Sequence, residues 1–186
     1  MQIEETKLKG CVLVTPKFFT DERGYFMESY RRSWMDSLTD FSGSFVQDNQ
    51  SLSHYGTIRG LHFQQGEDEQ SKVVGVLQGT IVDVVVDIIQ ASPTFGEQVS
   101  VELSAENNQQ LWIPKGFAHG FSVLSETALV CYKCDAYYNK EAEYGNHPLD
   151  KTLNIDWQIT REKKRNSDKA FLLPTVKTPH KPHATS

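Results

Sequence analysis

His62 is the residue with the strongest case for chemistry in this sequence. It stands in the stretch TIRGLHFQQG, between the apolar residues Leu61 and Phe63, which are typical of a strand turned into a core. A histidine has a pKa that is usable near neutral pH, so it can remove a proton from carbon when an adjacent ketone acidifies that proton. A lone histidine in a strand is more often a packed residue. The functional interpretation therefore depends on its neighbours.

The residues that follow His62 include the other groups that such a proton transfer needs. Lys72 is a cation that could be aimed at the ketone oxygen, where it would stabilise an enolate. A phenol on the other side of the substrate could return the proton to the opposite face. The segment CYKCDAYY supplies Tyr132, Tyr137 and Tyr138 as candidates, although each taken alone is more simply a core or rim aromatic. Removal from one face and return to the other would invert a stereocentre without a cofactor.

The position of Arg59 sets a geometrical condition on this site. In a regular strand His62 shares a face with Gly60 and Gln64, because successive side chains point to opposite sides. Arg59 can face the same cavity as His62 only if the strand bends or bulges. Gly60 is the residue that permits such a bulge.

A second histidine, His119, ends the segment PKGFAH, which resembles the second motif of the cupin superfamily, a double-stranded β-helix or jelly roll. Metal-binding cupins also carry a His-x-His pair and a glutamate in their first motif. This chain has Gln64 where the second histidine of that pair would be. Lys72 is a poor neighbour for a divalent ion, which neutral imidazoles, carboxylates and thiolates bind. The sequence therefore predicts a site without metal.

The three cysteines do not indicate a disulfide framework or a zinc site. Cys131 and Cys134 have the spacing of a zinc knuckle, but they lie in the strand-like run TALVCYKC. Three residues apart on a strand, their sulfurs would point to opposite faces. Together with Cys11 they are expected to be small packed residues.

Composition excludes several other classes of protein. The chain has 186 residues, a net charge of −5 and no long basic block, so it does not look like a nucleic-acid-binding protein. No apolar run approaches the ~18 residues of a membrane span. The first ten residues lack the features of a signal peptide, so a cytoplasmic protein is expected.

The elements that must position these residues are mostly short strands, which predict an all-β sandwich or barrel of one domain, residues 1–186. Residues 72–89 form two strand-like runs broken at Gln78–Gly79 by a hairpin-like turn. In the second run Asp83 shares a face with Ile81, Val85 and Asp87. Further strands are expected in 97–104, 109–113, 117–124 and 127–134, one helix in 28–40, a charged turn in 158–168, and a flexible tail from about residue 176.

Several long segments together resemble the dTDP-4-dehydrorhamnose 3,5-epimerase family. They are FTDERGYFMESY, FVQDNQSLS, TIRGLHFQ, ASPTFGEQVSVELSAENNQQLWIPKGFAHGF, YKCDAYY and NIDW, and the match runs from about residue 10 to 160. The resemblance implies a cupin jelly roll with a few short peripheral helices and a homodimer that exchanges strands. It implies a dTDP-4-keto-6-deoxy sugar nucleotide as substrate, in dTDP-L-rhamnose or related deoxysugar biosynthesis, and no metal and no cofactor.

The resemblance also assigns roles to individual residues. His62 corresponds to the general base, Tyr132 to the proton donor, and Lys72 and Arg59 to residues near the sugar carbonyl and the phosphates. Tyr138 corresponds to the aromatic that stacks on the thymine. The remaining matches are substrate-binding residues: Arg23, Glu28, Gln47, Asn49, Asp83 as the carboxylate partner of His119, His119 itself, Glu143 and Lys169.

The chain departs from the family pattern near its end. The family carries a Ser-x-Lys-Asp segment whose aspartate orients the catalytic histidine, and this chain has Ala170 at that position, with Lys169 and Asp168 before it. Loss of a carboxylate partner weakens a histidine base, so either Asp168 substitutes through a local shift, or His62 is held in another way, or this chain does reduced chemistry. Alternatives to a double epimerase therefore stay open: a mono-epimerase, a 3,4-ketoisomerase, or a non-catalytic cupin that binds a sugar nucleotide.

Overall fold

The computed structural model describes residues 1–34, 41, 43–160 and 165–166, and strands dominate this part of the chain. The strands are β1 (Gln2–Glu5), β2 (Val12–Thr15), β3 (Phe18–Asp21), β4 (Gly24–Met27), β5 (Gln47–His54), β6 (Thr57–Gln64), β7 (Lys72–Gln78), β8 (Thr80–Asp87), β9 (Gln98–Ser104), β10 (Gln110–Ile113), β11 (Phe117–Val123), β12 (Thr127–Cys134), β13 (Glu143–Gly145) and β14 (Arg165–Asn166). Two single 3-10 turns, η1 (Gly66–Asp68) and η2 (Lys140–Ala142), lie between them.

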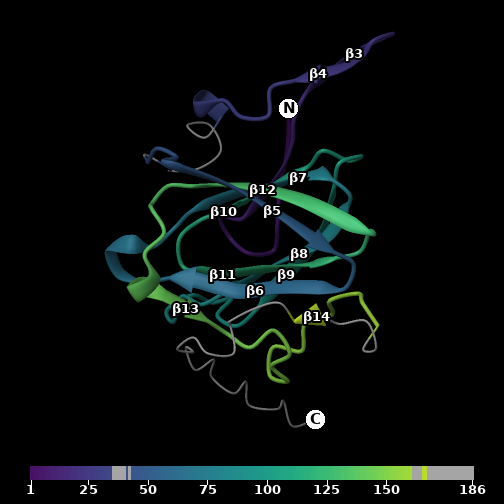
Figure 1. Ribbon diagram of the computed structural model, residues 1–186. Helices are drawn as coiled ribbons and strands as arrows, with labels where there is room; N and C mark the ends of the chain where they lie inside the picture. Colours follow the sequence, from purple (N-terminus) through teal and green to yellow (C-terminus); the bar gives the residue numbers. More distant parts are fainter. Residues whose placement is uncertain (35–40, 42, 161–164, 167–186) are drawn as a thin grey trace.

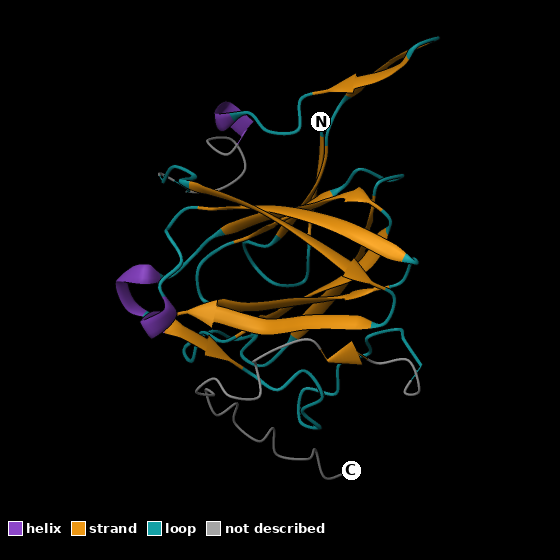
Figure 2. Cartoon of the chain, in the orientation of Figure 1, coloured by secondary structure: helices purple, strands orange, loops and turns teal. Residues whose placement is uncertain are grey.

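Two antiparallel sheets face each other and form the body of the molecule (Figures 1 and 2). The first sheet has the order β1-β2-β10-β7-β12-β5, and the second has the order β13-β6-β11-β8-β9, with β14 parallel to β6. From β7 to β12 the chain passes repeatedly between the sheets, which is the connectivity of a jelly roll. The predicted all-β fold is confirmed.

The break at Gln78–Gly79 is not a hairpin, so that prediction was wrong. The strand before it, β7, pairs with β10 and β12, whereas the strand after it, β8, pairs with β9 and β11 in the other sheet. Gly79 has a φ of +80°, and a Cβ there would lie 2.1 Å from the carbonyl oxygen of Thr127. A glycine is required because the chain turns a tight corner against the neighbouring strand.

The alternation predicted along β8 is confirmed, and it separates two apolar clusters. Ile81 and Val85 point between the sheets into the main core, which also contains Leu103 and Val130. The opposite face of the second sheet carries Val82, Val84 and Val86, and Leu153 and Trp157 pack over it. The inner face of β8 also carries Asp83, which is fully buried.

The N-terminal hairpin formed by β3 and β4 projects from the body of the molecule (Figure 1). We call residues 18–28 the arm. Its aromatic side chains Phe19, Tyr25 and Phe26 are 54%, 59% and 66% exposed, which is unusual for residues of this size. The helix expected in 28–40 is described only at residues 32–34. Most of the charged turn in 158–168 and the tail from 176 lie outside the described residues.

Candidate active site

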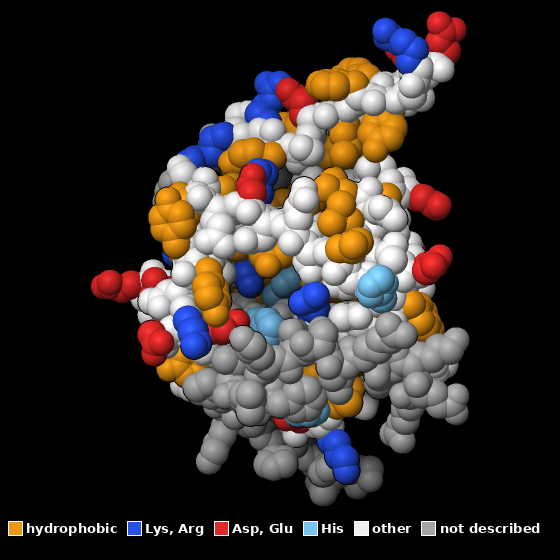
Figure 3. All heavy atoms as spheres, in the orientation of Figure 1, with side chains coloured by type: hydrophobic (Ala, Val, Ile, Leu, Met, Phe, Trp, Pro, Cys, Tyr) orange, Lys and Arg blue, Asp and Glu red, His pale blue; other side chains and the backbone are white. Residues whose placement is uncertain are grey.

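The side chains predicted to do chemistry meet in a cavity of ≈ 280 Å³ between the two sheets. Figure 3 shows lysine or arginine and histidine side chains gathered in a hollow on this face of the molecule. The residues that line the cavity are Gln47, Asn49, His62, Phe63, Gln64, Gln70, Lys72, Tyr132, Cys134, Tyr138 and Glu143. The structure therefore brings together His62, Lys72 and Tyr132, the three predicted catalytic residues.

His62 and Tyr132 reach this cavity from opposite sheets. His62 lies on β6 of the second sheet, and Tyr132 lies on β12 of the first sheet. Leu61 and Phe63, which flank His62, belong to the cluster on the outer side of the second sheet. The alternation of side chains along β6 therefore turns the imidazole toward the cavity, as the sequence predicts.

Lys72 lies beside Cys134 on the inner face of the first sheet. The two residues are paired across β7 and β12, and Cys134 is paired in turn with Gln47 on β5. Burial lowers the pKa of the Lys72 ammonium group, and the nearby acidic groups Asp83 and Glu143 partly oppose that effect. A partly desolvated cation in a cavity is well suited to interact with an oxygen that gains negative charge.

The bulge that the sequence requires in β6 is present next to Gly60. His119 of β11 is paired with His62, but Phe121 is paired with Arg59, so β6 contributes one residue more than β11 over this interval. Gly60 has a φ of +118°, and a Cβ there would lie 2.4 Å from the backbone of Gly120. The extra residue places Arg59 and His62 on the same side of the strand.

Arg59 is fixed by the facing sheet. Its Nε donates a hydrogen bond to Ser53 Oγ of β5 at 2.9 Å, and Ser53 is buried. A side chain of the facing sheet thus fixes the orientation of the guanidinium group, although Arg59 itself does not line the cavity around His62.

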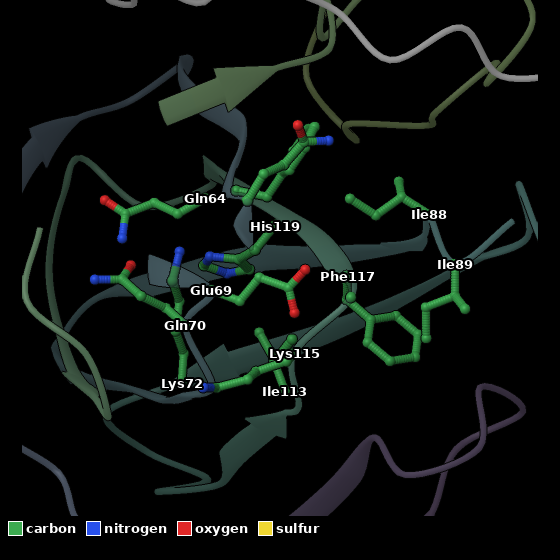
Figure 4. A pocket seen from close by; sticks show the side chains of 13 residues that line it. Gln64, Glu69, Gln70, Lys72, Ile88, Ile89, Ile113, Lys115, Phe117 and His119 are labelled. Atoms are coloured by element: carbon green, nitrogen blue, oxygen red, sulfur yellow. The ribbon is translucent and has the colours of Figure 1, made fainter. Parts of the chain in front are cut away.

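His119 lines an adjoining pocket of ≈ 310 Å³, which shares Phe63, Gln64, Gln70 and Lys72 with the cavity around His62, and it pairs with the fully buried Asp83. His119 Nε2 and Asp83 Oδ2 are 2.8 Å apart. Figure 4 shows the His119 ring and the Lys72 side chain pointing toward the same space. The carboxylate partner predicted for His119 is therefore in contact with it, and it fixes the orientation of the ring.

Four of the predicted substrate-binding residues, Gln47, Asn49, Tyr138 and Glu143, line the cavity and are joined by hydrogen bonds. Tyr138 donates a hydrogen bond from its hydroxyl group to Glu143 Oε2 at 2.8 Å, and its backbone N–H donates to Gln47 Oε1 at 3.0 Å. Gln47 Nε2 donates to Asn49 Oδ1 at 2.9 Å. The hydrogen bond to Glu143 raises the pKa of the Tyr138 phenol, so this side chain stays neutral near physiological pH.

Among the described residues, five of the predicted substrate residues do not line the cavity around His62: Arg23, Glu28, Arg59, Asp83 and His119. Arg23 and Glu28 lie on the arm, where Arg23 pairs with Asp21 of the arm and Glu28 pairs with Arg31 just after it. Lys169 lies outside the described residues, as do Ala170 and Asp168 at the segment that departs from the family pattern.

The cavity also contains residues that the sequence analysis did not assign to the site. Gln64 and Cys134 line it because they stand two positions after His62 and Tyr132 on their strands, so alternation was the signal that could have identified them. Gln70 precedes β7 in a loop, and nothing in the local pattern marks it.

Cys131 and Cys134 lie on opposite faces of β12, as predicted, and they line different pockets. Cys11 and Cys134 are buried, whereas Cys131 is partly exposed on the outer face. Among the described residues, no group of three or more His, Cys, Asp or Glu side chains could hold a metal ion. The same part of the chain contains no helix long and apolar enough to cross a membrane.

Comparison with known proteins identifies the family. The family model described as dTDP-4-dehydrorhamnose 3,5-epimerase matches residues 5–176. The dTDP-4-dehydrorhamnose 3,5-epimerase of Shigella flexneri is 46% identical over 159 residues, which cover 86% of this chain and 88% of that protein.

Two solved structures have the same fold over nearly the whole chain. The dTDP-4-dehydrorhamnose 3,5-epimerase of Elizabethkingia anophelis NUHP1 superposes with a TM-score of 0.90 at 47% identity, covering 97% of this chain and 99% of that one. The dTDP-6-deoxy-D-glucose-3,5-epimerase of Legionella pneumophila Philadelphia 1, in complex with dTDP-4-keto-L-rhamnose, superposes with a TM-score of 0.88 at 45% identity. The match covers 94% of this chain and 92% of that one. The protein described here belongs to the dTDP-4-dehydrorhamnose 3,5-epimerase family.

Proposed function

We propose that this chain inverts C3 and C5 of a dTDP-4-keto-6-deoxyhexose, and that His62, Lys72 and Tyr132 carry out the reaction. The observation that supports these roles most directly is the position of His62 and Tyr132 on opposite sheets around one cavity. A sugar ring bound between them would meet a base on one face and a proton donor on the other. Its family and its structural relatives support the same reaction.

In the proposed reaction His62 takes the proton from a carbon next to the ketone. The electron pair of the broken C–H bond moves into the new C=C bond of an enolate, and the ketone oxygen becomes negatively charged. Lys72 stabilises that oxygen, and because the charge develops only during the reaction the interaction lowers the barrier. Tyr132 then protonates the carbon from the other face, which inverts the centre. Once His62 has released its proton to solvent and the Tyr132 phenolate has taken one up from solvent, the same steps on the other side of the ketone invert the second carbon.

His119 and Asp83 serve as substrate-binding residues in this proposal. Their 2.8 Å contact holds the imidazole beside Lys72, where it can contact a hydroxyl group or the ketone oxygen of the sugar. Arg59 supplies a positive charge for the diphosphate. Tyr138, Gln47, Asn49 and Glu143 form the nucleotide end of the site, with Tyr138 stacked on the base.

We further propose a homodimer in which the arm of one subunit completes the site of the other. The exposed aromatic residues Phe19, Tyr25 and Phe26 support an arm that packs against a second copy. Arg23 and Glu28 lie on this arm, outside the cavity of their own chain. An arm from the partner subunit would bring both side chains to the nucleotide. The absence of metal and cofactor, and a cytoplasmic location, stay predictions.

The experiment that tests the function is incubation with dTDP-4-keto-6-deoxyglucose in D₂O, followed by proton NMR. Deuterium at both C3 and C5, with the epimerised product, is the expected result. Deuterium at one carbon would identify a mono-epimerase, and transfer of the ketone to C3 would identify a 3,4-ketoisomerase. Nucleotide binding without deuterium incorporation would identify a binding protein.

A further inference from the structure

The segment that carries Tyr138 is held by glutamine side chains rather than by strand pairing. Residues 136–139 follow one residue after the end of β12 and form no helix or strand. Gln70 Nε2 donates to the carbonyl oxygen of Ala136 at 2.9 Å. Gln47 Oε1 accepts from the N–H of Tyr138 at 3.0 Å. These two glutamines come from different elements, and both line the cavity around His62.

Gln64 makes the largest number of contacts to this segment. Its Oε1 accepts from the N–H of Asn139 at 2.7 Å, and its Nε2 donates to the carbonyl oxygens of Tyr137 at 3.2 Å and Asp68 at 2.7 Å. Both N–H groups and the carbonyl oxygen of the amide are thus bonded. Asn139 Nδ2 also donates to Asp68 Oδ2 at 2.7 Å, which closes the network. Since Gln64 is 6% exposed, loss of one bond would leave a buried polar group unsatisfied.

We call Gln47, Gln64 and Gln70 the glutamine clasp. The side chains of the clasp make a hydrogen bond with a main-chain group of each residue in 136–139. The three glutamines come from β5, β6 and the loop before β7. A loop fixed in this way has already lost the conformational freedom that a ligand would otherwise have to restrict on binding. Tyr138 is 53% exposed, so its ring is accessible while its backbone is held.

We propose that Gln64 and Gln70 are positioning residues that preorganise Tyr138 for the nucleobase, an inference that rests on the proposed function. They act on binding of the nucleotide rather than on proton transfer. His62, Lys72 and Tyr132 lie on strands whose backbones are fixed by the sheets, so they do not depend on the clasp for their position. Loss of a clasp bond should therefore weaken nucleotide binding much more than it lowers kcat.

The test measures the Kd of dTDP by calorimetry, and kcat by NMR, for Gln64→Leu, Gln70→Met, Tyr138→Ala and the double variants. We expect Gln64→Leu and Gln70→Met to raise Kd about fivefold to tenfold, with kcat within about threefold of wild type, because a lost hydrogen bond has an effect of this order. In the Tyr138→Ala background neither substitution should raise Kd further. This lack of additivity distinguishes an effect transmitted through Tyr138 from general destabilisation.

Gln98→Met is the matched control. Gln98 Nε2 also donates to a main-chain carbonyl, that of Leu153 at 3.1 Å, on the other side of the second sheet. The control should leave Kd and kcat unchanged. If Gln64→Leu does not fold, Gln70→Met decides the question, because Gln70 is only partly buried.

Two results would overturn the inference: an unchanged Kd in Gln70→Met, or a full additional loss of affinity when Gln70→Met is combined with Tyr138→Ala. Failure of the proposed function would look different. In that case the wild-type chain itself would bind no dTDP or exchange no sugar protons, whatever the variants do.

Discussion

His62 of β6 and Tyr132 of β12 line one cavity from opposite sheets. The jelly roll produces this relationship because β6 and β12 place their inward-facing side chains on either side of the space between the sheets. Under the proposed mechanism, a sugar ring bound in that space would meet the imidazole on one face and the phenol on the other. Inversion of a stereocentre by proton transfer requires such an arrangement.

Substitution of His62 by Asn should abolish exchange of the sugar protons while leaving nucleotide binding nearly intact. The base is lost, and general base catalysis contributes ~10²–10⁴-fold or more. NMR in D₂O measures the exchange, and calorimetry with dTDP measures the binding. Loss of that contribution would leave at most about a hundredth of wild-type turnover. A variant that keeps more than about a tenth would therefore show that His62 is not the base.

Substitution of Lys72 by Met should lower kcat about 10²–10³-fold and at the same time raise the melting temperature at neutral pH. Activity falls because a group that stabilises the enolate oxygen is lost. Stability rises because burial of the ammonium group, which lowers its pKa, disfavours the folded state. The comparison is thermal unfolding of wild type and variant in the same buffer.

The stability difference between wild type and Lys72→Met should depend on pH in a defined direction. The pKa of Lys72 in the folded chain lies below the value of 10.5 for an exposed lysine, so unfolding is accompanied by proton uptake between these two values. The free-energy cost of burying the charged Lys72 ammonium group is therefore fully present below the pKa of Lys72 in the folded chain. That cost disappears as pH rises toward 10.5. If the difference in melting temperature between wild type and Lys72→Met increases at high pH, the pKa of Lys72 is not lowered in the folded chain.

Mixed dimers can test whether the arm acts on the partner's site. Neither His62→Asn nor Arg23→Ala should be active alone at substrate concentrations well below KM. If each arm serves the other subunit, a co-refolded one-to-one mixture should regain about a quarter of wild-type activity, because half of its dimers contain one intact site. A mixture that stays inactive, or an Arg23→Ala chain as active as wild type, would contradict the exchanged arm.

Incubation with EDTA should not change the rate of epimerisation. The place where a metal-binding cupin has its second histidine is occupied by Gln64, whose amide groups are bonded to the protein, and the cation of Lys72 lies in the same cavity. The measurement is the rate before and after chelation and dialysis. Loss of activity that a divalent ion restores would overturn the metal-free prediction.

The strands and their faces could be predicted because alternation is a local property. The pattern of Ile81, Asp83 and Val85 against Val82 and Val84 shows the two faces of β8 without any knowledge of its partners. The corner at Gly79 was misjudged because glycine marks a hairpin and a change of sheet in the same way. Which strand pairs with which depends on contacts between distant residues, and no local pattern contains that information.

The candidate site could be predicted in part for the same reason. The bulge at Gly60 followed from the requirement that Arg59 and His62 share a side, and the pairing with β11 confirms it. The contacts of Gln64 and Gln70 to residues 136–139 could not be predicted, because they join side chains to a main chain more than sixty positions away. The family resemblance, rather than the local pattern, indicated Tyr132 among the neighbouring tyrosines.

The most direct test of proton transfer between opposite faces is the ratio of exchange to inversion in Tyr132→Phe, measured by proton NMR in D₂O. Phenylalanine cannot protonate the enolate, whereas His62 and Lys72 remain to form it. The enolate should then be reprotonated mostly from the His62 side, so exchange at C3 and C5 should exceed epimerisation far more than in wild type. If exchange and inversion fall together by the same factor, Tyr132 is not simply the proton donor, and the opposed arrangement of His62 and Tyr132 does not explain the reaction.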